Sequence, residues 1–324
     1  MQRSSSSPVV LVSADKATKG GGDEKVNTYG YDVIPFSDVE VKHIRNVFKG
    51  NREWNFLDVV HVIISITSHS LCFFAASTFS WSTFWMAAVF ANITLLLGVT
   101  LSYHRNLAHK SFKLTKFLEY LFAYIGLHAV QGDPMWWVST HRYHHKFTDT
   151  VQDPHSPISG FWYSHFNWCG GLNNVKDLEM QLYYRFLHRT YLGHPIALGI
   201  LLYALGGFPY IVWGMGVRLT YTFHVTFLVN SVCHIWGHQA WDTGDLSKNN
   251  WLVAILTHGE GWHNNHHAFE FSARQGLEWW QIDMTWYTMK LLEFFGLATD
   301  LKVPTETQKQ RMSFNTKTTD DLTK

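Results

Sequence analysis

The sequence predicts an all-α membrane protein in which four transmembrane helices form two hairpins and a helical cap lies on one side of the membrane. Charged residues make up only 16% of the 324 residues, against about 25% in typical soluble domains. Three stretches contain no Asp, Glu, Lys or Arg: 59–103, 190–217 and 219–241. The chain also carries 15 Trp, a residue that is enriched at the two surfaces of a membrane.

The uncharged stretches have room for two helical hairpins, because one crossing takes about 20 apolar residues. The polar run Ser77–Ser82 marks the first turn, and the glycines Gly214 and Gly216, close to Arg218, mark the second. A soluble protein with buried helices is the alternative, but uncharged runs of this length are rare in such proteins. The four predicted spans cover about residues 59–79, 82–103, 194–214 and 216–237.

Two hairpins place both ends of the chain and the segment between the hairpins on one side of the membrane. The apolar segment Phe117–Val130 is too short to span and carries Glu119, so we expect it to form an interfacial helix on that side. The positive-inside rule puts this side in the cytosol or in the equivalent compartment of an organelle. The basic residues on which this rests are Lys42, Arg45, Lys49, Arg52, Arg105, Lys110, Lys113 and Lys116.

The predicted membrane domain covers residues 51–312, and both ends of the chain are polar. Residues 1–50 are expected to be disordered, and their Ser-rich, acid-poor start indicates either an organellar transit peptide or an ordinary flexible tail. Residues 313–324 lack an apolar period and are expected to form a flexible tail. Lys plus Arg total 26 and Asp plus Glu total 25, a balance that argues against nucleic-acid binding.

Twenty histidines are the unusual feature of the composition, and eight of them form three clusters. In the second and third clusters, spacings of three and four residues put the rings on one face of a helix. The three scattered cysteines are too few for a Cys-based zinc site. The predicted topology places every cluster on the same side of the membrane, so they can share a transition-metal site. The clusters are His104 and His109; His141, His144 and His145; and His263, His266 and His267.

The last predicted span adds Asn230 and His234, which lie one helical turn apart near its cytosolic end. Polar groups inside a span are costly and often functional, although an interhelical hydrogen bond is the alternative. The total of nine histidines exceeds what one metal ion can coordinate, so we predict two metal ions. Nitrogen ligands favour iron for redox work; zinc fits the same ligands but cannot change its oxidation state.

Polar residues beside the clusters are candidates to accept hydrogen bonds from the imidazole N–H groups and so to orient the rings. A helix cap or a surface carboxylate is the alternative for each. These candidates are Glu260, Asp149, Asp153 and Asn264.

Four segments carry a resemblance to a known family: "SYHRNLAHKSFKL", "WVSTHRYHHKFTDTVQDPHSP", "LVNSVCHIWGHQAW" and "GEGWHNNHHAFEFSARQGLEWWQ". They resemble the histidine boxes and their surroundings in membrane fatty-acid desaturases of the stearoyl-CoA-desaturase-like family. Within the plant branch of that family, the sequence looks most like the plastid palmitoyl-monogalactosyldiacylglycerol Δ7 desaturases. The likeness covers about residues 50–312.

The resemblance implies four spans, a cap that holds two iron ions and a kinked tunnel for the acyl chain. By matching position, it implies that Asn230 holds one iron through a water molecule. Trp136, Trp137 and Trp241 are candidate walls of the tunnel, with packing in the membrane belt or the core as the alternative. The implied histidine ligands are His104, His109, His141, His144, His145, His234, His263, His266 and His267.

The sequence departs from the family pattern in three places. Ser139 and Thr140 stand where animal acyl-CoA members carry Arg-Asp, which favours a lipid-bound acyl chain over acyl-CoA. Between Trp168 and Asn173 the sequence is shorter than its relatives, so an element of the cap is expected to be reduced. The His-Pro-Gly-Gly motif of a fused haem domain does not occur, so electrons are expected from a separate donor.

The activity implied by the resemblance is O₂-dependent introduction of a cis double bond into a saturated acyl chain, namely palmitoyl on a plastid galactolipid at Δ7. The alternatives are a Δ9-type acyl-CoA or acyl-lipid desaturase of the endoplasmic reticulum, a di-iron lipid hydroxylase, and a metal-binding membrane scaffold or transporter. A chloroplast membrane implies ferredoxin as the electron donor, and the endoplasmic reticulum implies cytochrome b5. Membrane lipid surrounds the protein in either location.

Overall fold

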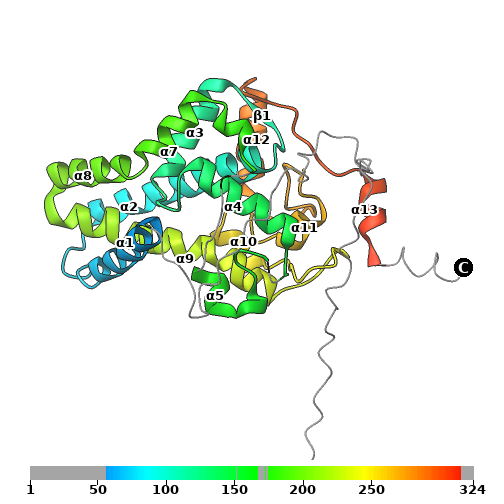
Figure 1. Ribbon diagram of the computed structural model, residues 1–324, viewed down its shortest axis with the longest axis horizontal. Coiled ribbons are helices and arrows are strands. Elements are labelled where there is room, and N and C mark those ends of the chain that lie inside the picture. Colours follow the sequence, from blue (N-terminus) through cyan, green and yellow to red (C-terminus); the bar gives the residue numbers. More distant parts are fainter. Residues whose placement is uncertain (1–55, 151, 167–171, 173, 315–324) are drawn as a thin grey trace, which may run out of the picture. The chain divides into compact units, whose positions relative to one another are not determined.

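A computed structural model describes residues 56–150, 152–166, 172 and 174–314, and within these ranges the chain is almost entirely helical (Figure 1). The predictions for residues 1–50, and for all but the first two residues of 313–324, lie outside the described residues. The helices are α1 (Phe56–Cys72), α2 (Trp81–Ile93), the π-helical η2 (Thr94–Ala108), α3 (Lys116–Leu127), α4 (Pro134–Phe147), η3 (Pro157–Ser159), α5 (Phe161–Phe166), α6 (Lys176–Glu179), α7 (Leu182–Thr190), α8 (Gly193–Ile211), the π-helical η4 (Val212–Val217), α9 (Arg218–Ser231), η5 (Val232–His234), α10 (Trp251–Leu256), α11 (His263–Ala268), α12 (Met284–Phe294) and α13 (Glu306–Met312).

The described strands, β1 (Lys113–Leu114) and β2 (Ala298–Thr299), form one short antiparallel pair in which Lys113 faces Thr299. This pair ties the segment that follows the first histidine cluster to the segment that follows α12. The prediction of an all-α fold class is therefore confirmed apart from this small sheet.

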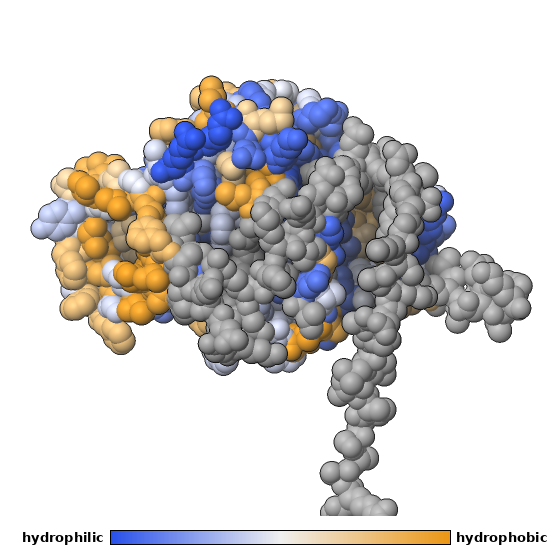
Figure 2. Space-filling view, in the orientation of Figure 1, coloured by the Kyte–Doolittle hydropathy of each residue, from blue (hydrophilic) through white to orange (hydrophobic). Residues whose placement is uncertain are grey.

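Two continuous helical runs are long and apolar enough to cross a membrane, Trp81–Ala108 and Gly193–His234, and Asp58–Cys72 is a shorter apolar helix. Figure 2 shows apolar residues gathered at the end of the molecule where Figure 1 places α1, α2 and α8. Large apolar side chains are exposed there, including Ile63, Trp85 and Leu205, as expected for surfaces that face lipid rather than water.

The first hairpin turns earlier than predicted, because α1 ends at Cys72 rather than near residue 79. The hydroxyls of Ser77 and Thr78 both donate to the carbonyl oxygen of Phe74, and such local bonds compete with continuation of a helix. Ser80 then begins α2 with a reciprocal capping box to Thr83, which fixes the start of the second helix.

The helical run Gly193–His234 has a kink at Gly207, not at the predicted turn Gly214–Gly216. Gly207 has φ +64° inside the α8 range, a conformation that glycine adopts at little cost, and Pro209 follows it. The predicted turn glycines are helical instead and allow close packing. A Cβ on Gly214 would lie 2.6 Å from Leu202, and one on Gly216 would lie 2.6 Å from Leu71.

Helix α3 packs along η2 at a point where two glycines meet. A Cβ on Gly98 of η2 would lie 2.6 Å from the backbone of Gly126 of α3, so the two helices approach as closely as backbones allow. The predicted helix at Phe117–Val130 therefore exists as α3, with Phe122 and Leu127 buried against its neighbours. Its predicted location at the membrane interface stays a prediction.

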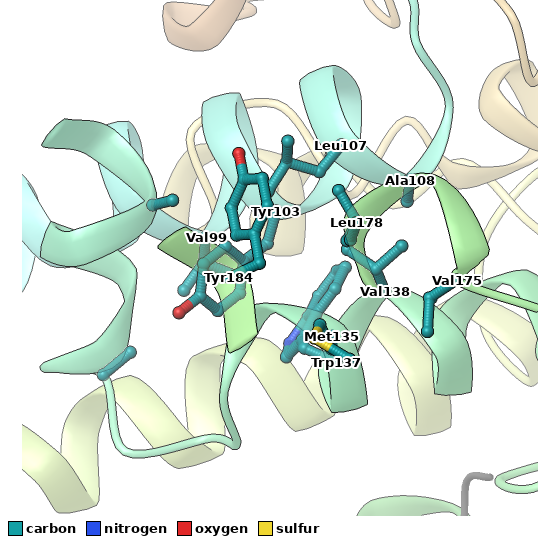
Figure 3. Packing of buried hydrophobic residues seen from close by; sticks show 12 residues of the cluster. Val99, Tyr103, Leu107, Ala108, Met135, Trp137, Val138, Val175, Leu178 and Tyr184 are labelled. Carbon is teal, nitrogen blue, oxygen red and sulfur yellow. The ribbon is translucent and has the colours of Figure 1, made fainter. Parts of the chain in front are cut away.

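A hydrophobic cluster joins the elements that carry the first two histidine clusters (Figure 3). Tyr103 and Leu107 of η2 pack against Met135 and Trp137 of α4. Val175, Leu178 and Tyr184 cover this core from the side of α6 and α7. These buried contacts fix η2 relative to α4, so the histidines at their ends keep a defined separation.

Gly98→Ala is expected to destabilise the protein by about 1–3 kcal/mol, the usual cost of overpacking, because its Cβ would meet backbone that cannot rotate away. Gly199→Ala is the matched control, since its Cβ would lie 4.0 Å from the nearest atoms, both in Met215. Thermal unfolding of both variants in detergent tests this. Equal melting temperatures would contradict the close approach of α3 and η2.

Candidate metal centre

Nine histidines come together in two separate groups of metal-binding geometry. Within each group the nearest ring nitrogens all lie within 4.8 Å of one another. Group A contains His104, His109, His141, His145 and His266; group B contains His144, His234, His263 and His267. Every histidine predicted as a ligand falls in one of the two groups. Their assignment as metal ligands stays a prediction.

Each HxxHH cluster contributes to both groups, which the sequence pattern alone does not reveal. On α4, the middle histidine His144 points into group B while its neighbours His141 and His145 belong to group A. On α11, the middle histidine His266 belongs to group A while His263 and His267 belong to group B. The two helices therefore interlock the groups and hold them side by side.

The helix α4 begins with a strong local signal that places its histidines. Asp133 is the N-cap residue, and its carboxylate accepts hydrogen bonds from the backbone N–H groups of Met135 and Trp136, while Pro134 is the first helical residue. Both features are favourable at a helix start. The His141 ring then stacks on Trp137 of the preceding turn, with ring centroids 5.1 Å apart.

The ring nitrogens in each group approach one another directly. In group A, Nε2 of His266 lies 3.1 Å from Nε2 of His104 and 2.9 Å from Nε2 of His145. In group B, Nε2 of His263 lies 3.0 Å from Nε2 of His234 and 3.1 Å from Nε2 of His267. The Nε2 atoms therefore converge on two points, one in each group.

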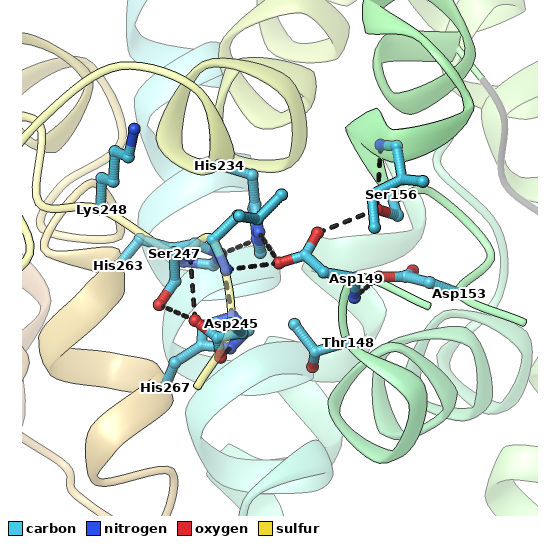
Figure 4. Close-up of polar contacts among 12 residues, drawn as sticks. Thr148, Asp149, Asp153, Ser156, His234, Asp245, Ser247, Lys248, His263 and His267 are labelled. Atoms are coloured by element: carbon cyan, nitrogen blue, oxygen red, sulfur yellow. Dashed lines mark hydrogen bonds and ion pairs between the residues drawn. The ribbon is translucent and has the colours of Figure 1, made fainter. Parts of the chain in front are cut away.

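Carboxylates on the outer side of the rings set this orientation. In group B, Nδ1 of His234 donates to Asp149 at 2.9 Å and Nδ1 of His267 donates to Asp245 at 3.0 Å (Figure 4). Asp153 accepts from Nδ1 of His144 at 2.9 Å. A neutral imidazole whose Nδ1 carries the proton has a lone pair on Nε2. Three of the four Nε2 atoms in group B, those of His144, His234 and His267, therefore carry lone pairs that point to the same place.

Such an arrangement suits a bound cation and is unfavourable without one. Burial and the neighbouring rings hold the pKa of His141, His144 and His263 well below the usual value for histidine. The rings are neutral at pH 7, which is the form that binds metal. Carboxylate–histidine pairs of this kind are typical of metal sites, because they fix the tautomer and raise the basicity of the ligand. The residues present therefore fit a pair of transition-metal ions with nitrogen ligands.

Two of the orienting carboxylates, Asp149 and Glu260, remain ionised although they are enclosed. Burial raises the pKa of Asp149, but hydrogen bonds from His234 and from the backbone N–H of Leu246 outweigh this effect and bring it to about 2. For Glu260, burial is outweighed by Arg105 and His104, and its pKa is also about 2. These two carboxylates are therefore negative charges beside a ring, which favours a cation in the site, whereas burial raises the pKa of Asp153.

Three of the four predicted orienting residues contact histidine nitrogens. Glu260 pairs with Nδ1 of His104, and Asp149 and Asp153 pair as described above. The prediction for Asn264 is wrong, because its side-chain oxygen accepts the backbone N–H groups of Ala240 and Trp241. Its role is to hold the loop after η5 against α11.

Sequence reasoning missed Asp245 and Glu270. Asp245 lies in a loop with no histidine at helical spacing, so only the folded chain shows that it faces His267. Glu270 lies 3.5 Å from Nδ1 of His145 with its side chain partly exposed. It follows the third cluster by three residues, and this position is the one signal in the sequence that could have found it.

Asn230 and the three candidate tunnel residues have different surroundings. Asn230 is buried, and its side-chain nitrogen has no hydrogen-bond partner among the described residues. Trp136 stacks on His61 of α1, whereas Trp241 donates to Asn265 and packs on Phe269. Trp137, by contrast, touches group A directly through His141. The tunnel itself stays a prediction.

Asp245→Asn is expected to lower metal affinity by about 10- to 100-fold, the usual effect of losing an orienting carboxylate. The amide keeps the shape but removes the charge that His267 faces. Metal retained after dialysis against graded chelator measures the effect. Asp300→Asn, which changes an exposed carboxylate paired with Lys113, is the control. Equal retention in both variants would contradict the role given to Asp245.

The described part of the chain therefore combines helices long and apolar enough to cross a membrane with two histidine groups that could hold metal. The chain belongs to the fatty acid desaturase family, whose model matches residues 79–298. It is therefore a desaturase, an oxidoreductase that acts on lipid acyl chains, as the sequence predicted.

Curated plant proteins are similar over most of the chain. An acyl-CoA 5-desaturase of Anemone leveillei is 60% identical over 87% of this chain and 91% of its own length. A chloroplastic palmitoyl-monogalactosyldiacylglycerol delta-7 desaturase of Arabidopsis thaliana is 59% identical over 88% of this chain and 79% of its own. Delta-9 acyl-lipid desaturase 2 of Arabidopsis thaliana is 53% identical over 85% of this chain and 92% of its own length.

Proposed function

We propose that groups A and B each hold one iron ion and that this pair is the catalytic centre of an O₂-dependent acyl-chain desaturase. The single observation that carries the proposal is the convergence of nine imidazoles on two points. Group A supplies five nitrogens and group B four, and the buried side chain of Asn230 supports group B through water. Zinc would fit the same nitrogens but cannot change its oxidation state.

When bound, the iron pair supplies the oxidising power that an unactivated methylene requires, since such a carbon offers no handle for acid or base chemistry. The chain positions the acyl chain and excludes water from the site. Asp149, Asp153 and Asp245 hold the group B rings in one tautomer, and Glu260 does so in group A. Trp137 stacks on His141, where it can exclude water and form a tunnel wall with Trp136 and Trp241.

We propose four membrane spans in two hairpins, with the histidine groups in a cap on the cytosolic or stromal side. The break at Gly207 supports a division of the run Gly193–His234 into two spans. The apolar helix α1 would then pair with the run Trp81–Ala108 as the first hairpin. The membrane domain would cover residues 51–312.

The proposed substrate is palmitoyl on a plastid galactolipid, desaturated at Δ7 in a chloroplast membrane with ferredoxin as donor. Similarity to the chloroplastic delta-7 enzyme supports this. The positions that hold Arg-Asp in acyl-CoA members are Ser139 and Thr140, whose side chains are fully buried here and offer no charge to a CoA headgroup. The second candidate is an acyl-CoA or acyl-lipid desaturase of the endoplasmic reticulum that uses cytochrome b5, which similarity to the Anemone and delta-9 enzymes favours.

Expression in a desaturase-deficient host tests these alternatives together. New monoenes with a Δ7 bond on galactolipid are expected, and their position and lipid class are read by mass spectrometry. A Δ9 or Δ5 bond on acyl-CoA or another lipid would replace the first substrate with the second. A new hydroxyl in place of an alkene would identify a hydroxylase, and the absence of any product would contradict the proposed activity.

A further inference from the structure

Cations directly follow group A histidines in the chain, whereas largely buried carboxylates contact the histidines of group B. Lys110 directly follows His109, and Arg142 directly follows His141. In group B, the residues that contact the outer ring nitrogens are Asp149, Asp153 and Asp245. The exposed edge of group A at His145 carries Glu270. The surface beside group A that carries Lys110 can therefore attract an acidic partner.

One carboxylate links that cationic surface to the interior. Asp177 accepts two hydrogen bonds from the buried guanidinium of Arg142, at 2.9 and 3.0 Å, and pairs with Lys110 at 2.9 Å. Arg142 also donates to the carbonyl oxygens of Leu107 and Ala108. A continuous path of bonds and hydrogen bonds therefore runs from Lys110 at the surface, through Asp177 and Arg142, to His141 of group A.

Two further lysines lie near Asp177, at the two ends of α6. Lys176 is exposed at the start of α6, and Lys116 contacts Gln181 just after the end of α6. The side chains of Lys110 and Lys116 are 44% and 60% exposed. Val175 and Leu178 anchor α6 in the core, as Figure 3 shows, so this framework is rigid. Lys110, Lys116 and Lys176 are named the basic surface.

The basic surface keeps a net positive charge although acids lie beside it. Asp177 is shared between two cations, and Glu119, which pairs with Lys116, also accepts from Tyr184. Exposed ion pairs contribute little binding energy, so these lysines can exchange their partners for those of a docking protein at little cost. The charged groups here are Lys110, Lys116, Arg142, Lys176 and Arg185 against Glu119, Asp177 and Glu179.

We infer that the basic surface is the docking site of an acidic one-electron carrier protein, ferredoxin in the location proposed above, and that electrons enter the enzyme at group A. The inference rests on the proposed function, which consumes two electrons for each double bond. In balance, R–CH₂–CH₂–R′, O₂, two electrons and two protons give R–CH=CH–R′ and two H₂O. The carrier is oxidised twice in each cycle, and complementary charge speeds each encounter.

The test is a charge-reversal variant, Lys110→Glu/Lys116→Glu, reconstituted in neutral-lipid vesicles. Its matched control is Lys290→Glu/Lys309→Glu, which reverses two lysines that also pair with neighbouring glutamates. At low ionic strength, KM for reduced ferredoxin should rise about tenfold or more in the first variant alone, and the difference should shrink with added salt. Ferredoxin bound to the vesicles should fall in parallel, and turnover with dithionite should stay unchanged.

Several results would overturn the inference. One is equal ferredoxin binding and KM in both variants. Another is a change in binding and KM that appears with the cytochrome b5 haem domain and not with ferredoxin. A third is a loss of binding to anionic vesicles without an effect on ferredoxin. The last result would identify the surface as a lipid contact. Lys110→Arg/Lys116→Arg should retain full ferredoxin binding. A wild-type protein that binds ferredoxin but makes no product would instead count against the proposed function.

Discussion

Replacement of His266 by Ala is expected to abolish formation of unsaturated product, a loss of at least about 1,000-fold in turnover. Nε2 of His266 lies 3.1 Å from Nε2 of His104 and 2.9 Å from Nε2 of His145, so its removal takes one of the five nitrogens from group A. The remaining rings would hold metal poorly, and a single ion in group B cannot replace a pair. Lipid analysis by mass spectrometry and metal analysis of the purified protein measure the effect.

The control for this variant is His194→Ala, which removes a histidine of α8 whose described hydrogen bond is to Thr190. Both variants should insert into membranes and elute as folded protein in detergent. Product formation should persist in His194→Ala and disappear in His266→Ala. Retained product in His266→Ala would count heavily against the ligand set.

Arg105→Met is expected to destabilise the protein by about 3–5 kcal/mol, the cost of breaking a buried ion pair from one side. The side chain of Arg105 is 1% exposed and pairs with Glu260 and Asp283. Methionine fills much of the same volume but leaves both carboxylates enclosed without their cation. Glu260 also orients His104, so metal retention should fall together with stability.

Unfolding in detergent, followed by circular dichroism, tests this prediction. Arg185→Met is the control, since Arg185 is only partly buried and makes a single described hydrogen bond, to the carbonyl oxygen of Glu179. A melting temperature for Arg105→Met within the error of the Arg185→Met control would show that the buried network around Glu260 and Asp283 does not hold the centre together.

The histidine spacing predicted the parts of the site that depend on local helix geometry. Residues three and four positions apart share a face, which is why α4 and α11 each present three rings. The division of those rings between two groups depends on how α4 and α11 cross, and no local pattern encodes that. His144 and His266 therefore each joined the group opposite to that of their neighbours.

The misses have the same physical origin, because contacts distant in sequence leave no periodic signal. Asp245 reaches His267 through an irregular loop, so nothing in its neighbourhood marked it. The turn was predicted at Gly214 and Gly216, whereas the structure kinks the helix at Gly207 and uses those two glycines for close helix packing. Glycine permits both roles, and only the packing distinguishes them.

We propose that nine imidazoles hold two redox-active metal ions at one place in the cap. The most direct measurement is the metal content of the purified full-length protein by mass spectrometry, with Mössbauer spectra of ⁵⁷Fe-grown protein. We predict two iron ions per chain with nitrogen-rich ligation. We also predict that the variants His263→Ala and His266→Ala lose these ions. Zinc in place of iron, or a single iron that is unchanged in both variants, would contradict it.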